Sequence, residues 1–238
     1  MKIALIGYGK MGKAIEEIAL AKGHEIVLKI SSSTIDLLTK ENLQQADVAI
    51  EFTNPESAVQ NIKLCADAGV PCISGSTGWL KNWHEVVNYV NEKQGAFLYG
   101  SNFSIGVNLF FELNKYLAKL MKPYKDYDVS LEEIHHTHKK DAPSGTAITL
   151  AEQVLHEITS KKNWVNAPSG NKEDLVILSQ RIDPAPGTHT IKYSSEIDDI
   201  EITHTAHNRK GFAGGAVLAA EFIKDKKGIF TMQDVLFR

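Results

Sequence analysis

Hydrophobic positions in the first hundred residues alternate between short apolar runs, typical of strands, and segments with helical spacing. Short apolar runs typical of strands occur at Lys2–Ile6, Glu25–Ile30, Asp47–Phe52, Pro71–Ser74 and Ala96–Tyr99. Between the first two runs, apolar side chains recur at helical spacing up to Gly23, and a second such helix starts near Pro55 and ends at Gly69. Strands that alternate with helices predict a doubly wound α/β domain through about residue 104.

The pattern changes in the second half of the chain. A long helical stretch is expected near Val107 to Met121, followed by a strand through Val129 to His135 and a helix after Thr146. Three strand-like runs then come without helices between them: Leu175–Arg181, Thr188–Tyr193 and Ile200–Ala206. We therefore expect an antiparallel or mixed sheet in a second, α+β domain.

The boundary between the two domains is expected near Asn102 to Ser104, so that residues 1–104 form the first domain and 105–208 the second. A Gly- and Ala-rich helix is expected from Phe212 to Ile223, and Ile229 to Leu236 could return to the first domain. Residues 209–238 would then complete that domain.

Composition narrows the classes of partner. The 238 residues are 43% hydrophobic and 23% charged, as in ordinary globular proteins, and the formal net charge is only -3. Such a balance does not favour nucleic-acid binding, and no apolar run approaches membrane-spanning length. The N-terminus reads as a strand and not as a targeting segment, and Cys65 and Cys72 read as buried apolar residues. We expect a cytoplasmic protein with a small-molecule partner.

A glycine-rich turn follows the first strand. Gly7, Gly9 and Gly12 match the dinucleotide fingerprint of Rossmann-like domains, in which the glycines permit a tight turn and a close approach to pyrophosphate. A glycine turn without a ligand is the alternative. The acidic residue that usually binds the ribose is missing, because the second strand ends in Ser31-Ser32-Ser33 with Lys29 beside it. The choice between NADPH and NADH therefore stays open.

Candidate chemistry is concentrated between Glu133 and Ala147. His135, His136 and His138 can exchange protons near neutral pH, and Lys139 can hold a carboxylate. A metal site and a structural cluster are the alternatives. Successive strand residues point to opposite faces, so His135 and His136 cannot easily share one ion, and no nearby pattern completes a ligand set. No metal is expected.

The segment Ser144-Gly145-Thr146 lies where the predicted helix after residue 146 begins. Ser144 could simply cap that helix. The free amides of a helix N-terminus also attract anions, and Lys139 could add a compensating charge. This arrangement predicts a site for an acidic substrate.

These residues resemble the 4-hydroxy-tetrahydrodipicolinate reductase family, also called dihydrodipicolinate reductases. The resemblance is carried by the pattern Glu-x-His-His-x-x-Lys-x-Asp-Ala-Pro-Ser-Gly-Thr-Ala at Glu133 to Ala147. Further matching segments are Gly7–Gly12, Phe52–Pro55, Gly75–Gly78, Ser101–Asn108 and Glu201–His204, with Arg209 and Phe212. The chain departs from the family in looking shorter than many members and in having Ser76 where threonine is frequent.

The resemblance implies reduction of a cyclic unsaturated imine dicarboxylate to tetrahydrodipicolinate with hydride from NADPH or NADH, in lysine and diaminopimelate biosynthesis. It implies that His135 is the general acid with Lys139 as its partner, and that His136, Gly145 and Thr146 hold the substrate, with Ser144 as an addition. The implied cofactor contacts are Gly7, Tyr8, Gly9, Lys10, Met11, Gly12, Gly75, Ser76, Thr77, Gly100, Ser101, Asn102 and Phe103. The family also implies a homotetramer built through the second-domain sheets.

Three other functions are weighed against this one. Another Rossmann-type oxidoreductase would need different catalytic groups, such as a reactive cysteine, which neither Cys65 nor Cys72 supplies convincingly. A non-catalytic nicotinamide-binding relative would have kept the fold and lost the chemistry. A metal-dependent hydrolase would contain a bound metal ion.

Overall fold

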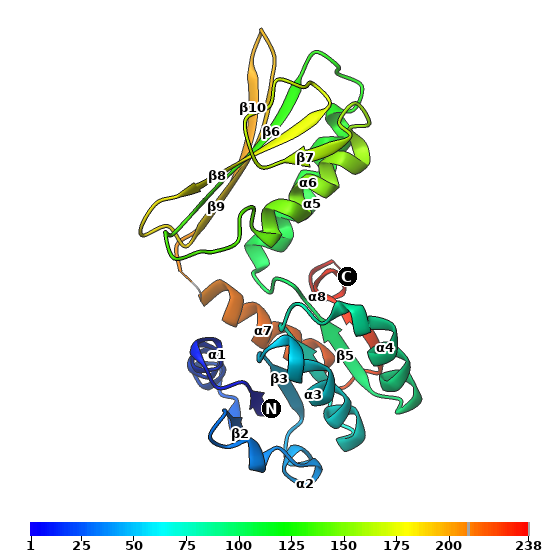
Figure 1. The fold of residues 1–238 in the computed structure, drawn as a ribbon. Coiled ribbons are helices and arrows are strands. Elements are labelled where there is room, and N and C mark those ends of the chain that lie inside the picture. Colours follow the sequence, from blue (N-terminus) through cyan, green and yellow to red (C-terminus); the bar gives the residue numbers. More distant parts are fainter. Residues whose placement is uncertain (209, 238) are drawn as a thin grey trace. The chain divides into compact units, whose positions relative to one another are not determined.

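The computed structural model describes residues 1–208 and 210–237 (Figure 1). The chain divides into two compact units: Met1–Ile105 with Lys210–Arg238, and Gly106–Arg209. Arg209, one of the residues that carry the resemblance, lies outside the described part of the chain. Within that part, no helix is long and apolar enough to cross a membrane.

The first unit is built on a six-stranded parallel sheet with the order β11-β5-β4-β3-β1-β2. Its strands are β1 (Lys2–Ile6), β2 (Glu25–Ile30), β3 (Val48–Glu51), β4 (Cys72–Ser74), β5 (Ala96–Tyr99) and β11 (Gly228–Thr231). The order reverses between β1 and β3, because β2 is added on one side of β1 and β3 on the other. In open parallel sheets this reversal point is where ligands bind, at the carboxyl ends of the strands. The α/β fold predicted for this half is confirmed.

Helices cover both faces of this sheet and enclose two apolar cores. They are α1 (Lys10–Ala21), α2 (Lys40–Leu43), α3 (Pro55–Ala68), α4 (Trp83–Glu92), α7 (Lys210–Ile223) and α8 (Met232–Leu236), with short 3-10 turns η1 (Ile35–Leu37) and η2 (Leu80–Asn82). The small residues of α7 allow close packing: a Cβ atom on Gly215 would lie 1.7 Å from the carbonyl oxygen of Phe103. After α7 the chain adds β11 beside β5, so its C-terminal segment belongs to the first unit.

The second unit has a five-stranded mixed sheet with the order β10-β9-β6-β8-β7. Its strands are β6 (Asp128–His135), β7 (Asn163–Val165), β8 (Asp174–Arg181), β9 (Gly187–Ser194) and β10 (Asp199–Ala206), and its helices are α5 (Ile105–Met121) and α6 (Gly145–Glu157). β6 pairs in parallel with β8 and antiparallel with β9. The mixed sheet expected from three strand-like runs without helices is confirmed.

Side chains on the inner face of this second sheet change character along its length. At one end, Val129, Leu131, Leu175, Ile177, Ile191 and Tyr193 are buried and belong to the core that α5 and α6 complete. At the other end the same rows continue with Glu133, His135, Ser179, Arg181 and His189. Because alternate strand residues share a face, one row on each strand passes from apolar packing into a polar cluster.

Candidate functional site

The glycine turn after β1 has the geometry that a dinucleotide site requires. Gly7 has a φ of 99°, and a Cβ atom on it would lie 1.9 Å from the carbonyl oxygen of Phe52. A Cβ atom on Gly12 would lie 2.5 Å from the carbonyl oxygen of Gly7. Neither position tolerates a side chain. Gly9 precedes α1 and has no side chain to cap it, so backbone amides at the helix start can face an anion.

A pocket opens beside this turn at the carboxyl ends of β1, β2 and β3. It is lined by Ile6, Gly7, Tyr8, Gly9, Ile30, Ser31, Ser32, Ile35, Thr53, Asn54, Ser57 and Asn61, none of them acidic. Lys29 lies near this pocket but is engaged: its Nζ is 2.8 Å from Glu16 and 5.1 Å from the centre of the Tyr8 ring. Tyr8 donates its hydroxyl hydrogen to Glu16. Lys10 is exposed and Met11 is half-buried.

The loops after β4 and β5 hold the remaining residues expected to contact the cofactor. Gly75 packs against Phe52, since a Cβ atom on it would lie 2.1 Å from the ring. Ser76 is buried, whereas Thr77 and Ser101 are exposed. Gly100 and Asn102 lie in the turn after β5, where Asn102 accepts a hydrogen bond from the backbone N–H of Ser104 at 2.8 Å. Phe103 is only 2% exposed and packs against Phe52, with ring centres 5.5 Å apart.

Glu51 is a residue of this region that the sequence analysis missed. It ends β3 and is fully buried. It accepts hydrogen bonds from the backbone N–H of Thr53 at 3.0 Å, from the hydroxyls of Ser74 at 2.5 Å and Ser76 at 2.8 Å, and from the Thr53 hydroxyl. One carboxylate therefore joins the loops after β3 and β4. The signal in the sequence that could have indicated Glu51 was a charged residue at the end of an otherwise apolar strand.

Replacing Glu51 with glutamine is expected to weaken cofactor binding. The amide would offer one acceptor oxygen to several donors, and its NH₂ group would face hydroxyls that now donate, so Thr53 at the pocket wall would shift. We expect a dissociation constant for NADPH and NADH that is about tenfold higher, the size of one lost charge-assisted hydrogen bond. Isothermal titration of the folded variant measures this change. The exposed Glu92→Gln variant is the control, and equal affinities in both variants would contradict the role.

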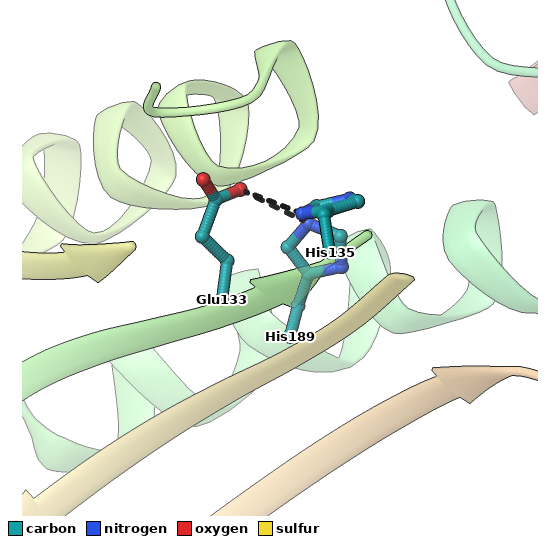
Figure 2. Close-up of side chains that lie close together, drawn as sticks. All are labelled: Glu133, His135 and His189. Carbon is teal, nitrogen blue, oxygen red and sulfur yellow. Dashed lines mark ion pairs between the residues drawn. The ribbon is translucent and has the colours of Figure 1, made fainter. Parts of the chain in front are cut away.

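In the second unit, strand register brings distant residues around Glu133 (Figure 2). Glu133 and His135 are two residues apart on β6 and rise from the same face. His189 on β9 and Ser179 on β8 are the cross-strand partners of Glu133, and Arg181 is the partner of His135. The sequence analysis named His135 but missed the other partners. His189 lies two residues before Ile191 and four before Tyr193, and this alternation was the signal that could have placed it on the inner face.

Glu133 is fully buried but surrounded by hydrogen-bond donors. The backbone N–H of Ser144 lies 3.1 Å from both carboxylate oxygens, and Oε1 also accepts from Ser179 at 2.8 Å and from Arg181 at 3.2 Å. Burial alone would raise the pKa of Glu133. Hydrogen bonds from Ser144 and Ser179 and the charge of His135 outweigh it, so the pKa of Glu133 lies below its usual range and the carboxylate stays charged.

Two imidazoles face the other carboxylate oxygen. Nδ1 of His135 lies 3.4 Å and Nε2 of His189 3.7 Å from Oε2 of Glu133, and the two rings meet edge to face at 5.1 Å. Burial lowers the pKa of His135, while Glu133 acts in the opposite direction. Burial lowers the pKa of His189 to about 4, and the neighbouring His135 adds to this effect. His189 is therefore neutral near pH 7.

The ligand atoms of Glu133, His135 and His189 lie within 4.8 Å of one another, which is a spacing that a metal ion could use. The group differs from the histidine run considered from the sequence, because His136 and His138 are not part of it. The guanidinium of Arg181 lies 3.2 Å from Glu133 and already compensates its charge. This positive neighbour disfavours a second cation, so we interpret the cluster as a proton-handling group.

The loop after β6 carries Lys139 and is tied to the sheet by Arg181. The Arg181 guanidinium donates to the carbonyl oxygens of Asp141 at 2.6 Å and Lys139 at 3.4 Å. Nζ of Lys139 lies 2.8 Å from both carboxylate oxygens of Asp141. His136 is half-buried in this loop, and its Nδ1 has no hydrogen-bond partner among the described residues. A ligand carboxylate near Lys139 would have to compete with Asp141.

The start of α6 adjoins the same cluster. Ser144 is its N-cap: Oγ accepts from the backbone N–H of Ala147 at 3.2 Å and lies 3.2 Å from Nε2 of His189. The hydroxyl of Ser144 is thus engaged, as is its backbone N–H, which binds Glu133. Gly145 is exposed, and a Cβ atom on it would meet nothing within 4 Å. Thr146 is half-buried in the same turn. Open space before the first amides of α6 suits a carboxylate.

The low pKa of His189 predicts a loss of stability in mild acid. The unfolded imidazole takes a proton near its ordinary pKa of 6.5, whereas the folded one resists protonation down to about 4. The contribution of neutral His189 to the free energy of unfolding is therefore complete above pH 6.5 and decreases as the pH falls below that value. Between pH 7 and pH 5 we expect a decrease on the order of 1–2 kcal/mol in the free energy of unfolding.

Urea unfolding at both pH values, followed by circular dichroism, measures this loss. The His189→Gln variant should lose less stability than wild type over the same range, because it has no imidazole to protonate. The exposed His156→Gln variant is the matched control and should retain the full difference. Equal losses in wild type and His189→Gln would rule out His189 as the source.

Comparison with known proteins identifies the family. The dihydrodipicolinate reductase N-terminus family matches residues 1–103, and the dihydrodipicolinate reductase C-terminus family matches residues 106–236. A 4-hydroxy-tetrahydrodipicolinate reductase of Christiangramia forsetii is 49% identical over 99% of this chain and 98% of its own length. One from Methanocaldococcus jannaschii is 34% identical over 98% of this chain and 80% of its own length.

A solved structure shares the fold. It is a dipicolinate-bound dihydrodipicolinate reductase from Paenisporosarcina sp. TG-14, with a TM-score of 0.79, 22% sequence identity and 99% coverage of both chains. The two family matches together span nearly all of the sequence, and the second also includes α7, β11 and α8, which belong to the first unit. The chain belongs to the dihydrodipicolinate reductase family.

Proposed function

We propose that this chain reduces 4-hydroxy-tetrahydrodipicolinate, by way of dihydrodipicolinate, to tetrahydrodipicolinate in lysine and diaminopimelate biosynthesis. The protein is an oxidoreductase of the family identified above. The observation that carries the proposal is the position of His135 beside the start of α6. Glu133 contacts both the backbone N–H of Ser144 and the His135 imidazole, so a proton donor and an anion site share one anchor.

His135 is the proposed general acid. A nicotinamide cofactor, when bound, supplies the hydride. Addition of hydride to a conjugated imine leaves an electron pair on the ring, which must receive a proton to give the product. The His135 imidazole has a pKa held below its usual range by burial, opposed by Glu133. Binding of a doubly negative substrate would raise that pKa and favour the protonated form.

The substrate carboxylates are proposed to bind to two positive regions. One carboxylate meets the amides of Gly145 and Thr146 at the start of α6, where the helix dipole favours a negative charge. Lys139 binds the other in place of Asp141, with His136 beside it. Ser144 acts indirectly, because its N–H and hydroxyl already bind Glu133 and cap α6.

The cofactor is proposed to bind the first unit, through the glycine turn of Gly7–Gly12 and the loops after β4 and β5. Support comes from the two glycine positions where no Cβ atom fits and from the adjoining pocket. No acidic side chain lines the part of that pocket formed by Ser31 and Ser32. A ribose phosphate would therefore not be repelled there, and we propose that both NADPH and NADH are used.

Assembly is proposed to involve the sheet of the second unit. Helices α5 and α6 cover one face of this sheet (Figure 1). On its other face, Leu178 is 41% exposed. Among the described residues of this unit, no helix packs against that other face. We propose a cytoplasmic homotetramer built through it, in which residues 105–208 bind substrate and partner subunits and residues 1–104 with 209–238 bind cofactor. A monomeric mass by light scattering at micromolar concentration would contradict this assembly.

The decisive experiment follows the oxidation of NADPH and NADH by the purified protein. Substrate is made in the assay from pyruvate and aspartate semialdehyde by the preceding synthase. Rapid oxidation that depends on both synthase substrates would establish the activity and rank the cofactors. A folded protein that binds either cofactor but oxidises neither would instead be a non-catalytic nicotinamide-binding relative.

A further inference from the structure

Glu133 is a buried carboxylate that has no direct part in the reaction outlined above. Its two oxygens have different surroundings. Oε1 accepts from Ser179 and Arg181 in addition to the shared N–H of Ser144. Oε2 accepts that shared N–H and faces the two imidazoles. The donors around Oε1 fix the carboxylate, and Oε2 is the atom left to act on a histidine.

The two nitrogens of His135 also have different surroundings. Nδ1 points inward, 3.4 Å from Oε2 of Glu133, and is buried without a hydrogen bond of good geometry. Such contacts are often long in an enzyme without substrate and tighten in the complex. Nε2 lies beside Gly187, where a Cβ atom would be only 3.0 Å away. The lack of a side chain at Gly187 leaves room beside Nε2.

His189 faces the same oxygen but does not compete for the proton. Its Nε2 is 3.7 Å from Oε2 of Glu133 and nearer, at 3.2 Å, to the hydroxyl of Ser144. It is 4% exposed, so a charge on it would be costly. A single positive charge on this pair of imidazoles therefore resides on His135.

We propose that Glu133 is a positioning residue that holds the His135 ring with a protonated Nδ1 turned inward, so that Nε2 is the nitrogen that passes its proton to the substrate. This assignment rests on the general-acid role proposed for His135. Glu133 also binds the N–H of Ser144, so the same carboxylate sets the distance between the acid and the start of α6. Proton transfer then moves one proton from Nε2 to the ring carbon, and the imidazole returns to its neutral form with hydrogen on Nδ1.

Charged groups on several elements act on the pKa of His135 and therefore on the pH profile of the reaction. Those that act on His135 are Glu133 on its own strand, Arg181 on β8, and Lys139 and Asp141 in the following loop, with the neutral His189 on β9. Glu133 and Asp141 favour the imidazolium, whereas Lys139 and Arg181 oppose it. Removing the charge of Glu133 must therefore make His135 lose its proton at a lower pH.

The Glu133→Gln variant tests this expectation at nearly constant volume. The basic limb of kcat/KM should move to lower pH by roughly one unit, the effect of one nearby opposite charge. At pH 7.5, kcat/KM should fall about tenfold, while cofactor affinity stays that of wild type. Glu133→Asp, which keeps the charge, should restore the position of the limb in part. Glu157→Gln, on the far part of α6, is the matched control. A wild-type pH profile in Glu133→Gln would overturn the proposal.

A second measurement depends neither on activity nor on a substitution at Glu133. Nitrogen-15 spectra of wild-type protein, with the His135 signal assigned by its loss in His135→Gln, report which nitrogen carries the proton of the neutral ring. The expected form above the pKa has hydrogen on Nδ1, and hydrogen on Nε2 would overturn the proposal. Inactive wild-type protein would refute the proposed function alone, because the spectra would still decide whether Glu133 orients His135.

Discussion

Replacement of His135 by alanine is expected to lower kcat by roughly 10²- to 10⁴-fold, the usual contribution of a positioned general acid. The ring electron pair left by hydride addition would have to take its proton from water. The neighbouring His189 cannot substitute, because burial holds its pKa at about 4 and the acidic imidazolium form is scarce near pH 7. Steady-state kinetics in the coupled assay, at saturating cofactor, measures the loss.

Cofactor affinity separates this chemical effect from a general loss of structure. The residues proposed to bind cofactor lie in the first unit and His135 in the second, so His135→Ala should bind NADPH with nearly unchanged affinity. His156→Ala, whose side chain is 82% exposed, is the control and should keep wild-type turnover. Turnover of His135→Ala near that of wild type would exclude His135 as the general acid.

The first unit is the part of the fold that the sequence predicts best, and local physics explains why. Strands β1, β3, β4 and β5 are largely buried apolar runs. Helix α3, between β3 and β4, carries its own end signals, because Asn54 caps its start and Gly69, with a φ of 72°, ends it. Helix α4 was not predicted: no side chain caps its start, and it buries only Val86 and Val90. Strand β7, with three residues, is too short for a period to be visible.

Less of the candidate site than of the first unit could be predicted from the sequence. His135, Lys139 and the start of α6 could be identified from the local sequence, because they lie within one short segment of the chain. Ser179 and His189 could not, since strand register alone places them against Glu133. Register depends on the whole sheet and its turns, and a shift of one residue would move His189 to the opposite face. Glu51 was missed for a related reason, because its hydroxyl partner Ser74 comes from a neighbouring strand.

Replacement of Lys139 by alanine is expected to raise the KM for substrate by roughly 10- to 100-fold, because a carboxylate would lose a charged partner worth about 1.5–3 kcal/mol. The Lys139 side chain is 22% exposed, and its ammonium group is paired with Asp141 before substrate arrives. Breaking this ion pair offsets part of the gain from binding the substrate. Lys139 also opposes the protonation of His135. The basic limb of kcat/KM should therefore move to higher pH in Lys139→Ala, the reverse of the shift expected for Glu133→Gln.

The adjacent Lys140 provides a matched control for this variant. It is exposed in the same loop, so Lys140→Ala removes an equal charge without removing the proposed substrate contact. Lys139→Arg keeps the charge and should recover part of the substrate affinity, although a planar guanidinium cannot reproduce the position of the ammonium. Substrate saturation curves of the three variants decide between a local contact and general attraction. If Lys139→Ala and Lys140→Ala raise KM equally, the substrate responds to the charge of the loop as a whole, and Lys139 has no specific role.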